Sequence, residues 1–305
     1  MRTTSYYVRG LLRQLLPYGV ANRRRARLMA SATSSEHLKE IDWRAAYYNK
    51  LVQSFDAGQA PRIVDVSWDR SRYFLDFDEA SRGFGPDRRL DYLFGDVTHV
   101  PDRPTVVKSR PIAGANTNSV LLKLNRLRHF KWSPDPSPFR DKAPAAVWRG
   151  TAHNLQRKSL VQTFYTHPQF DIGHTSGQVN NLRPKSRLTH AEQKRYRFLI
   201  SLEGNDVATN LKWGMASNML VMSPRLRFET WFLEGLLEPG THFVLLKDDL
   251  SDLEEKVEYF TAYPDAAEQI IGNAHKWIAM FTEPLKERII AMRVLETYFR
   301  LSGQL

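Results

Sequence analysis

The feature that most constrains the fold is a regular alternation of strand-like and helix-like segments in the second half of the chain. Short apolar runs end near residues 150, 175, 204, 224 and 249, and a segment with helical spacing of apolar residues follows each of them. Strands that alternate with helices form parallel βαβ units. The sequence therefore predicts an α/β fold, with a doubly wound domain over residues 144–283.

The first half of the chain is less regular. Strands are expected in residues 62–68 and 88–100, and a helix over residues 118–130, where apolar residues recur at helical spacing. A proline-rich connection over residues 131–144 reads as a linker or long loop. We therefore expect a separate domain over residues 36–143, joined by a C-terminal helix over residues 284–305.

The positive charge of the chain is concentrated at its start. The formal net charge is +11, and residues 1–35 contain seven arginines and no acidic residue, so subtracting these seven leaves +4 for the rest of the chain. This basic N-terminal arm, residues 1–35, interleaves arginine with leucine and tyrosine and could lie on an anionic membrane surface. The alternatives are a basic helix packed on the domain and a disordered arm.

Several classes of site are absent from the sequence. There is no cysteine, no glycine-rich dinucleotide or P-loop motif and no HExxH pattern, and the nine histidines show no metal-ligand spacing. No apolar run approaches the length that spans a bilayer. Because the charge lies in the arm and no RNA-binding motif occurs, we do not expect a nucleic-acid partner.

Polar residues gather where the predicted strands end. Arg149, Gly150 and Thr151 end one strand, and "EGND" (203–206) ends another ahead of a helix that carries Asn210 and Lys212. In parallel α/β folds such strand ends form a crevice that binds anionic ligands. The alternative is that these residues only make tight turns and helix caps.

The segments "KSRPI" (108–112), "NSVLLKLNRLRHF" (118–130), "VWRGT" (147–151), "SLEGNDVATNLKW" (201–213), "ASNMLVMSP" (216–224) and "ETWFLEGLLEPGTHFVLLKDDLSDLEEKVEYF" (229–260) together resemble the family 90 glycosyltransferases. The likeness covers roughly residues 90–280 and is closest to the bacterial branch. It rests on the order and spacing of the segments rather than on one motif.

The resemblance implies a GT-B fold, in which two Rossmann-like domains face a cleft. It implies transfer of a sugar, glucose or xylose, from a UDP-sugar with inversion and without a metal or other cofactor. The acceptor would be a hydroxyl of a cell-surface glycan, a lipopolysaccharide or capsule. The enzyme would be cytoplasmic and peripheral on the inner membrane.

The resemblance also assigns residues to the donor site. Asn210 departs from the arginine of eukaryotic members, so Lys212 or another cation must neutralise the diphosphate. Glu229 is expected to start a helix and to take ribose hydroxyls, or alternatively to complement a helix dipole. The donor-binding residues implied are Arg149, Gly150, Thr151, Gly204, Asn205, Asn210, Lys212, Ser217, Asn218 and Glu229.

Inversion needs a general base that takes the proton from the acceptor hydroxyl. The family's base is an aspartate ahead of a proline in the first domain. Asp102 lies two residues before a proline and Asp96 ends the better strand, so both stay candidates, with Asp102 slightly favoured. Lys108 and Arg110 are candidate ligands of the acceptor or the sugar, or loop cations. The alternative function is a non-catalytic protein that binds glycans or nucleic acid.

Overall fold

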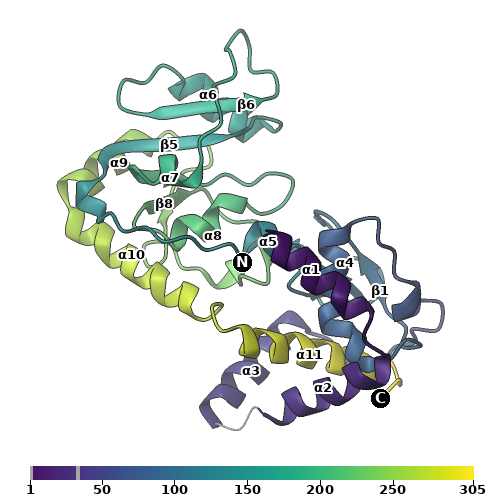
Figure 1. The fold of residues 1–305 in the computed structure, drawn as a ribbon. Helices are drawn as coiled ribbons and strands as arrows, with labels where there is room; N and C mark the ends of the chain where they lie inside the picture. Colours follow the sequence, from purple (N-terminus) through teal and green to yellow (C-terminus); the bar gives the residue numbers. More distant parts are fainter. Residues whose placement is uncertain (1–2, 32–34) are drawn as a thin grey trace. The chain divides into compact units, whose positions relative to one another are not determined.

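The computed structural model describes residues 3–31 and 35–305, and for residues 35–37 the backbone alone. The chain divides into two compact units (Figure 1). Unit 1 consists of Met1–Lys131, Arg227–Leu233 and Phe281–Leu305, and unit 2 of Trp132–Leu226 and Glu234–Met280.

Unit 2 is built on a five-stranded parallel sheet, which confirms the parallel α/β prediction. The strand order is β10-β8-β7-β5-β6. Numbered along the chain, this is the order 2-1-3-4-5 of a doubly wound sheet. The strands are β5 (Ala143–Thr151), β6 (Asp171–Ser176), β7 (Tyr196–Ile200), β8 (Leu220–Ser223) and β10 (Val244–Leu245).

Helices cover both faces of this sheet. Alternate strand residues such as Trp148, Phe198 and Met222 share one core with apolar residues of α6, α9 and α10. On the other face α8 lies so close that a Cβ on Gly214 would come within 2.4 Å of Leu199. The helical elements of unit 2 are η3 (Phe139–Asp141), α6 (Leu155–Phe164), α7 (His190–Gln193), α8 (Thr209–Met215), η4 (Glu234–Leu236), α9 (Leu253–Ala262) and α10 (Pro264–Ala279).

Unit 1 contains a smaller parallel sheet and a separate strand pair. The sheet has the order β1-β2-β4, and the two remaining strands pair with each other in antiparallel fashion. The strands are β1 (Asp91–Leu93), β2 (Thr105–Val107), β3 (Ser109–Pro111), β4 (Ser119–Leu121) and β9 (Phe228–Thr230). The helical elements are α1 (Thr3–Gln14), α2 (Tyr18–Ala30), α3 (Ser35–Tyr48), η1 (Ile63–Asp65), α4 (Ser71–Ser81), η2 (Arg82–Phe84), α5 (Arg126–His129) and α11 (Pro284–Leu301).

Two elements of unit 1 differ from the sequence predictions. The helix expected over residues 118–130 is wrong, because β4 occupies its start and α5 only four residues near its end. All three residues of β4 are buried, and a strand buried on both faces cannot be told from a buried helix by periodicity. The strand expected over residues 62–68 is instead the short 3-10 helix η1.

The N-terminal arm is helical where it is described and packs within unit 1. The hydroxyl of Tyr6 on α1 lies 2.9 Å from both the Asp76 carboxylate and the Arg72 carbonyl, two acceptors for its one proton. Arg25 on α2 donates to the Gly83 carbonyl at 3.0 Å. Of the interpretations above, the structure shows the packed basic helix; residues 1–2 and 32–34 of the arm lie outside the described residues.

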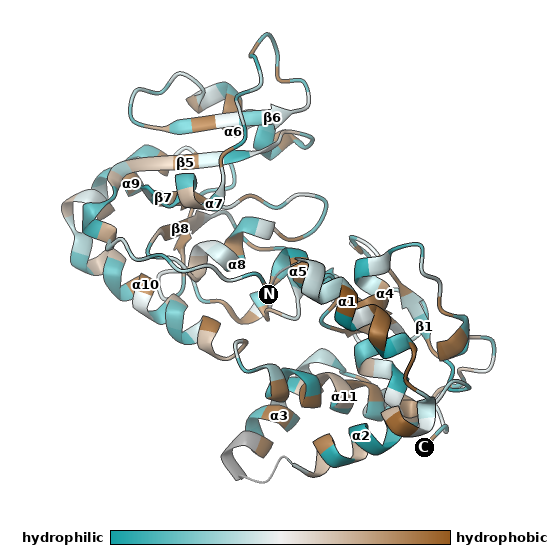
Figure 2. Cartoon of the chain, in the orientation of Figure 1, coloured by the Kyte–Doolittle hydropathy of each residue, from teal (hydrophilic) through white to brown (hydrophobic). Residues whose placement is uncertain are grey.

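Figure 2 shows both apolar (brown) and polar (teal) residues on helices such as α1 and α11, as expected for helices that pack through one face. Within the described residues, no helix has the length and apolar character needed to cross a membrane.

Candidate donor site at the sheet switch point and candidate base

The strand order of unit 2 contains one switch point, between β5 and β7, where successive connections run to opposite sides of the sheet. The chain leaves β5 for β6 on one side and returns to β7 on the other. The helix after β5, α6, belongs to one face of the sheet and the helix after β7, α8, to the opposite face. The carboxyl ends of β5 and β7 therefore border the crevice in which doubly wound proteins bind their ligands.

Arg157 connects these two strand ends. From the first turn of α6 its guanidinium donates to the carbonyls of Leu202 (2.8 Å) and Glu203 (3.0 Å) after β7, and to that of Thr151 (3.1 Å) at the end of β5. Asn154 joins the same two loops by donating to the carbonyls of Glu203 and Gly204. The switch point thus holds a positive charge fixed by backbone groups.

Four predicted donor residues lie at this edge. Gly150 and Thr151 end β5, and Gly204 and Asn205 follow β7. The side chains of Thr151 and Asn205 are exposed, and the Thr151 hydroxyl lies 2.9 Å from that of Ser176. A Cβ on Gly204 would lie 3.2 Å from the Arg157 guanidinium, so glycine lets this cation approach the loop. The helix cap expected at Thr151 is instead Asn154, which accepts from the Arg157 amide.

Arg149 is held away from this edge. Its guanidinium donates to the Ser186 carbonyl (3.2 Å) and the Asp171 carbonyl (2.7 Å), and it pairs with the Asp171 carboxylate. Asp171 lies opposite Val147, two residues before Arg149, so the guanidinium points back along the sheet. Burial acts to raise the pKa of Asp171, but the hydrogen bond and charge of Arg149 outweigh it, and the pKa falls below its ordinary value.

Asn210 and Lys212 both serve the packing of α8. The Asn210 amide donates to the Ile200 carbonyl at 2.8 Å, which ties the helix to the end of β7. Lys212 is fully buried, and its ammonium lies 2.6 Å from the carboxylate of Glu234, which is also fully buried. The structure therefore does not bring the Lys212 charge to the open edge of the sheet.

Ser217 and Asn218 lie at the amino edge of the unit 2 sheet, opposite the carboxyl edge that carries Thr151 and Asn205. They precede β8, and the Ser217 hydroxyl donates to the Gly214 carbonyl at 2.6 Å. The backbone amide of Asn218 donates to the Asp135 carboxylate, and the side-chain amide of Asn218 donates to the Asp135 carbonyl. These contacts attach the proline-rich connection to unit 2, so residues 132–143 lie in this unit rather than in the first domain as expected. The two side chains are not part of the switch-point cluster.

In unit 1 the structure separates the two candidate bases. Asp96 follows β1 and Lys108 follows β2, so both lie at the carboxyl edge of the parallel sheet, where their charged groups are 2.5 Å apart. Lys108 is buried, whereas about a quarter of the Asp96 side chain, 26%, is exposed. Asp102 is exposed and precedes β2 at the amino edge, where its carbonyl accepts from the Asn118 amide. Geometry thus favours Asp96, against the slight preference for Asp102.

Arg110 and Glu229 form a buried pair within unit 1, and the helix expected to start at Glu229 is wrong. They face each other across β3 and β9, with the Arg110 Nε 2.8 Å from Glu229 Oε1, and they are 0% and 1% exposed. The other Glu229 oxygen accepts from the Tyr47 hydroxyl at 2.6 Å. Glu229 does not start a helix, because "ETW" is strand and turn, and both of its carboxylate oxygens bind protein groups.

Sequence reasoning missed Arg157. The sequence did contain a signal. A cation in the first turn of a helix is unfavourable beside the positive end of the helix dipole, which suggests a role other than helix stabilisation. Among the described residues no group of three or more His, Asp or Glu side chains is arranged to hold a metal.

Comparison with known proteins defines the class of this protein. Residues 122–298, more than half of the chain, match the family model described as glycosyl transferase family 90. The protein is therefore a glycosyltransferase, which transfers a sugar from a donor to an acceptor. The chain belongs to glycosyltransferase family 90.

The relatives agree with this assignment. The O-glucosyltransferase LpsA of Dichelobacter nodosus is 44% identical over 265 residues, which cover 86% of this chain and 83% of LpsA. Protein O-glucosyltransferase 3 of Homo sapiens is 24% identical over 180 residues, covering 57% of this chain and 35% of the human protein. An uncharacterized protein, 035R, of Invertebrate iridescent virus 3 is 25% identical over 259 residues, 70% of this chain and 23% of its own length.

Proposed function

We propose that this protein is an inverting glycosyltransferase that needs no metal and moves glucose from a UDP-sugar to a hydroxyl of a cell-surface glycan, such as a lipopolysaccharide or capsule. The preference for glucose over xylose rests on the O-glucosyltransferase from Dichelobacter nodosus, which is similar over 86% of this chain. A GT-B arrangement, with the enzyme peripheral on the inner membrane, remains a prediction from the family resemblance.

The cluster at the switch point of unit 2 is the observation that supports a nucleotide-sugar donor. A UDP-sugar carries a diphosphate, and guanidinium groups bind phosphate oxygens through charge-assisted hydrogen bonds. Arg157 is a cation that the structure brings to this edge. Lys212 and Arg149 lie elsewhere, each paired with a carboxylate. The Thr151 hydroxyl and the Asn205 amide lie on the same edge and can bind the phosphates or the sugar.

The proposed base is Asp96. In an inverting transfer the acceptor oxygen attacks the anomeric carbon of the donor, the base takes the proton of the acceptor hydroxyl, and the bond between the anomeric carbon and the phosphate oxygen breaks. Its electron pair leaves with UDP. The ion pair with Lys108 orients the Asp96 carboxylate at the carboxyl edge of β1 and β2.

The charge that develops on the departing UDP must be stabilised. Arg157 supplies a fixed positive charge whose position is set by three backbone carbonyls before any ligand binds. Such preorganised groups contribute a large share of catalysis, since they need no reorganisation during the reaction.

The experiment that tests this proposal is calorimetric titration with UDP, UDP-glucose, UDP-xylose and GDP-mannose, each in EDTA and again with manganese. We expect UDP and UDP-glucose to bind equally well in both conditions, and GDP-mannose to bind far more weakly. A requirement for manganese, or equal binding of GDP-mannose, would count against a metal-independent UDP site. Binding without sugar transfer to any glycan would instead favour a non-catalytic glycan-binding protein.

A further inference from the structure

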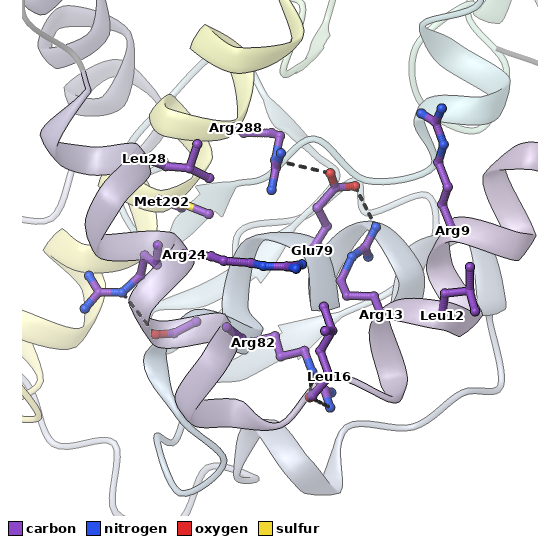
Figure 3. A pocket seen from close by; sticks show the side chains of 13 residues that line it. Arg9, Leu12, Arg13, Leu16, Arg24, Leu28, Glu79, Arg82, Arg288 and Met292 are labelled. Carbon is purple, nitrogen blue, oxygen red and sulfur yellow. Dashed lines mark hydrogen bonds and ion pairs between the residues drawn. The ribbon is translucent and has the colours of Figure 1, made fainter.

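Unit 1 contains a cavity that the proposed sugar transfer does not use. It has a volume of about 490 Å³ and is lined by α1, α2, the α4–η2 segment and α11 (Figure 3). Six arginines line it, and the one acidic residue among its lining is Glu79. The arginines are Arg9, Arg13, Arg24, Arg25, Arg82 and Arg288.

Some of this charge is neutralised by the protein. Glu79 pairs with Arg13 at 3.1 Å and with Arg288 at 3.4 Å. Burial acts to raise the pKa of Glu79, but the charges of Arg126 and Arg13 outweigh it and hold the pKa below its ordinary value, so Glu79 is ionised at neutral pH. Even when Asp78 and Glu296, the other acids paired with these arginines, are counted, three of the six positive charges remain in excess.

Arg9 and Arg24 carry two of these three charges. No hydrogen bond or ion pair joins either side chain to another of the described residues, and both residues are exposed. Figure 3 shows Arg24 extending from α2 across the cavity toward the Glu79 side, while Arg9 projects from α1. Guanidinium groups bind phosphate through paired, charge-assisted hydrogen bonds.

Part of the cavity wall is apolar, and the cavity lies beside an exposed apolar stripe on the surface of α1. Leu12, Leu16, Leu28 and Met292 contribute to its walls. On α1 the opposite face packs through Tyr6 and Gly10, while the face that carries Leu12 is exposed. The stripe consists of Val8, Leu11, Leu12 and Leu15, which are 48%, 54%, 58% and 79% exposed. Helices with an exposed apolar face flanked by arginine lie in the interface of anionic membranes.

We propose that this arginine cavity binds the phosphate of an anionic phospholipid, with the stripe on α1 inserted among the acyl chains of the bilayer surface. Arg9 and Arg24 would take the phosphate, and Leu12 would contact both the cavity and the membrane. The stripe favours a lipid over a free phosphate, because an inorganic ion gains nothing from exposed leucines. The inference does not depend on the identity of the donor sugar.

The test is sedimentation of the full chain with vesicles of phosphatidylcholine alone and with phosphatidylglycerol added. We expect binding to the anionic vesicles only. The double variant Arg9→Gln/Arg24→Gln should bind about 100-fold more weakly, since each set of hydrogen bonds from a guanidinium to a phosphate contributes about tenfold. Leu11→Ser/Leu15→Ser should also lose binding, without a change in net charge.

The matched control is Arg23→Gln/Arg27→Gln, which removes the same charge from exposed positions of α2 outside the cavity. It should bind within about threefold of the unaltered protein. An equal loss in both double variants would show diffuse attraction and overturn the cavity assignment, as would no binding by the unaltered protein. Full competition by millimolar inorganic phosphate would indicate a soluble phosphate ligand instead. Retained UDP binding and an unchanged circular dichroism melt would exclude misfolding of the variants.

Discussion

At the scale of single residues, the proposal of Asp96 as the base rests on where two aspartates lie relative to the parallel sheet of unit 1. Asp96 lies at the carboxyl edge beside Lys108, and Asp102 lies at the amino edge. We predict that Asp96→Asn lowers kcat about 10²- to 10⁴-fold, the usual contribution of a general base, and leaves UDP binding intact. The matched variant Asp102→Asn should transfer sugar within about twofold of the unaltered enzyme. The reverse ranking of the two variants would assign the base to Asp102.

A second prediction at this scale concerns the buried His174 on β6. It is 0% exposed, neither ring nitrogen has a hydrogen-bond partner among the described residues, and burial lowers the pKa of the imidazole. Below pH 6.5 the unfolded chain takes up a proton that the folded protein resists, so stability falls as pH falls, by at most about 1.4 kcal/mol per pH unit.

Urea unfolding at pH 7.0 and pH 5.5 checks this. His174→Phe removes the titrating group, so we expect the variant to lose less stability than the unaltered protein between the two values of pH. Identical losses in both proteins would mean that His174 takes up its proton without cost in the folded state.

At the scale of elements, the turn between β7 and α8 sets the position of Arg157. A Cβ at position 204 would lie 3.2 Å from its guanidinium, which is tighter than ordinary van der Waals contact. We predict that Gly204→Ala displaces the guanidinium and weakens UDP binding several-fold in calorimetry. Gly272→Ala in α10, where a Cβ meets no atom within 4 Å, is the control and should leave binding unchanged. Unchanged binding in Gly204→Ala would mean that the cation tolerates displacement.

The strand pair β3–β9 makes a prediction about stability. Arg110 and Glu229 are buried and joined at 2.8 Å, and removing one partner leaves the other charge unpaired inside the protein. Arg110→Met should therefore cost on the order of 3–5 kcal/mol of unfolding free energy. Arg62→Met should cost far less, because solvent screens its exposed pair with Asp65. Guanidinium-induced unfolding compares the two, and similar costs would contradict a structural role for the buried pair.

The same elements show how far the sequence could predict the structure. The sheet of unit 2 was predictable, since its strands lie in short segments that alternate regularly with helical segments. The strand β4 was not, because its fully buried residues have no polar face to give a period of two. The pairing of Glu229 with Arg110 was not predictable, because the two residues are 119 positions apart in the chain, a distance over which sequence patterns carry no information.

At the scale of the whole molecule, each unit brings its functional candidates to the carboxyl edge of a parallel sheet. Asp96 and Lys108 lie at that edge in unit 1, and Thr151, Arg157 and Asn205 at that edge in unit 2. Predicted residues that turned out to lie elsewhere, such as Ser217, flank the amino ends of strands or fill the core. The residues at the carboxyl edges differ from the others in which end of a strand they follow or precede. Which end of each strand faces the ligand crevice is known only once the sheet topology is known.

The central claim is that Arg157 at the β5–β7 switch point binds the diphosphate of the donor. Calorimetric titration of UDP into the unaltered protein, Arg157→Met and Lys158→Met tests it most directly, since Lys158 is the next residue on the same helix. We predict that Arg157→Met weakens binding about 10- to 100-fold, as expected for hydrogen bonds to a charged group, and that Lys158→Met changes it by less than about threefold. Equal affinities in all three proteins would contradict the claim and place the diphosphate elsewhere.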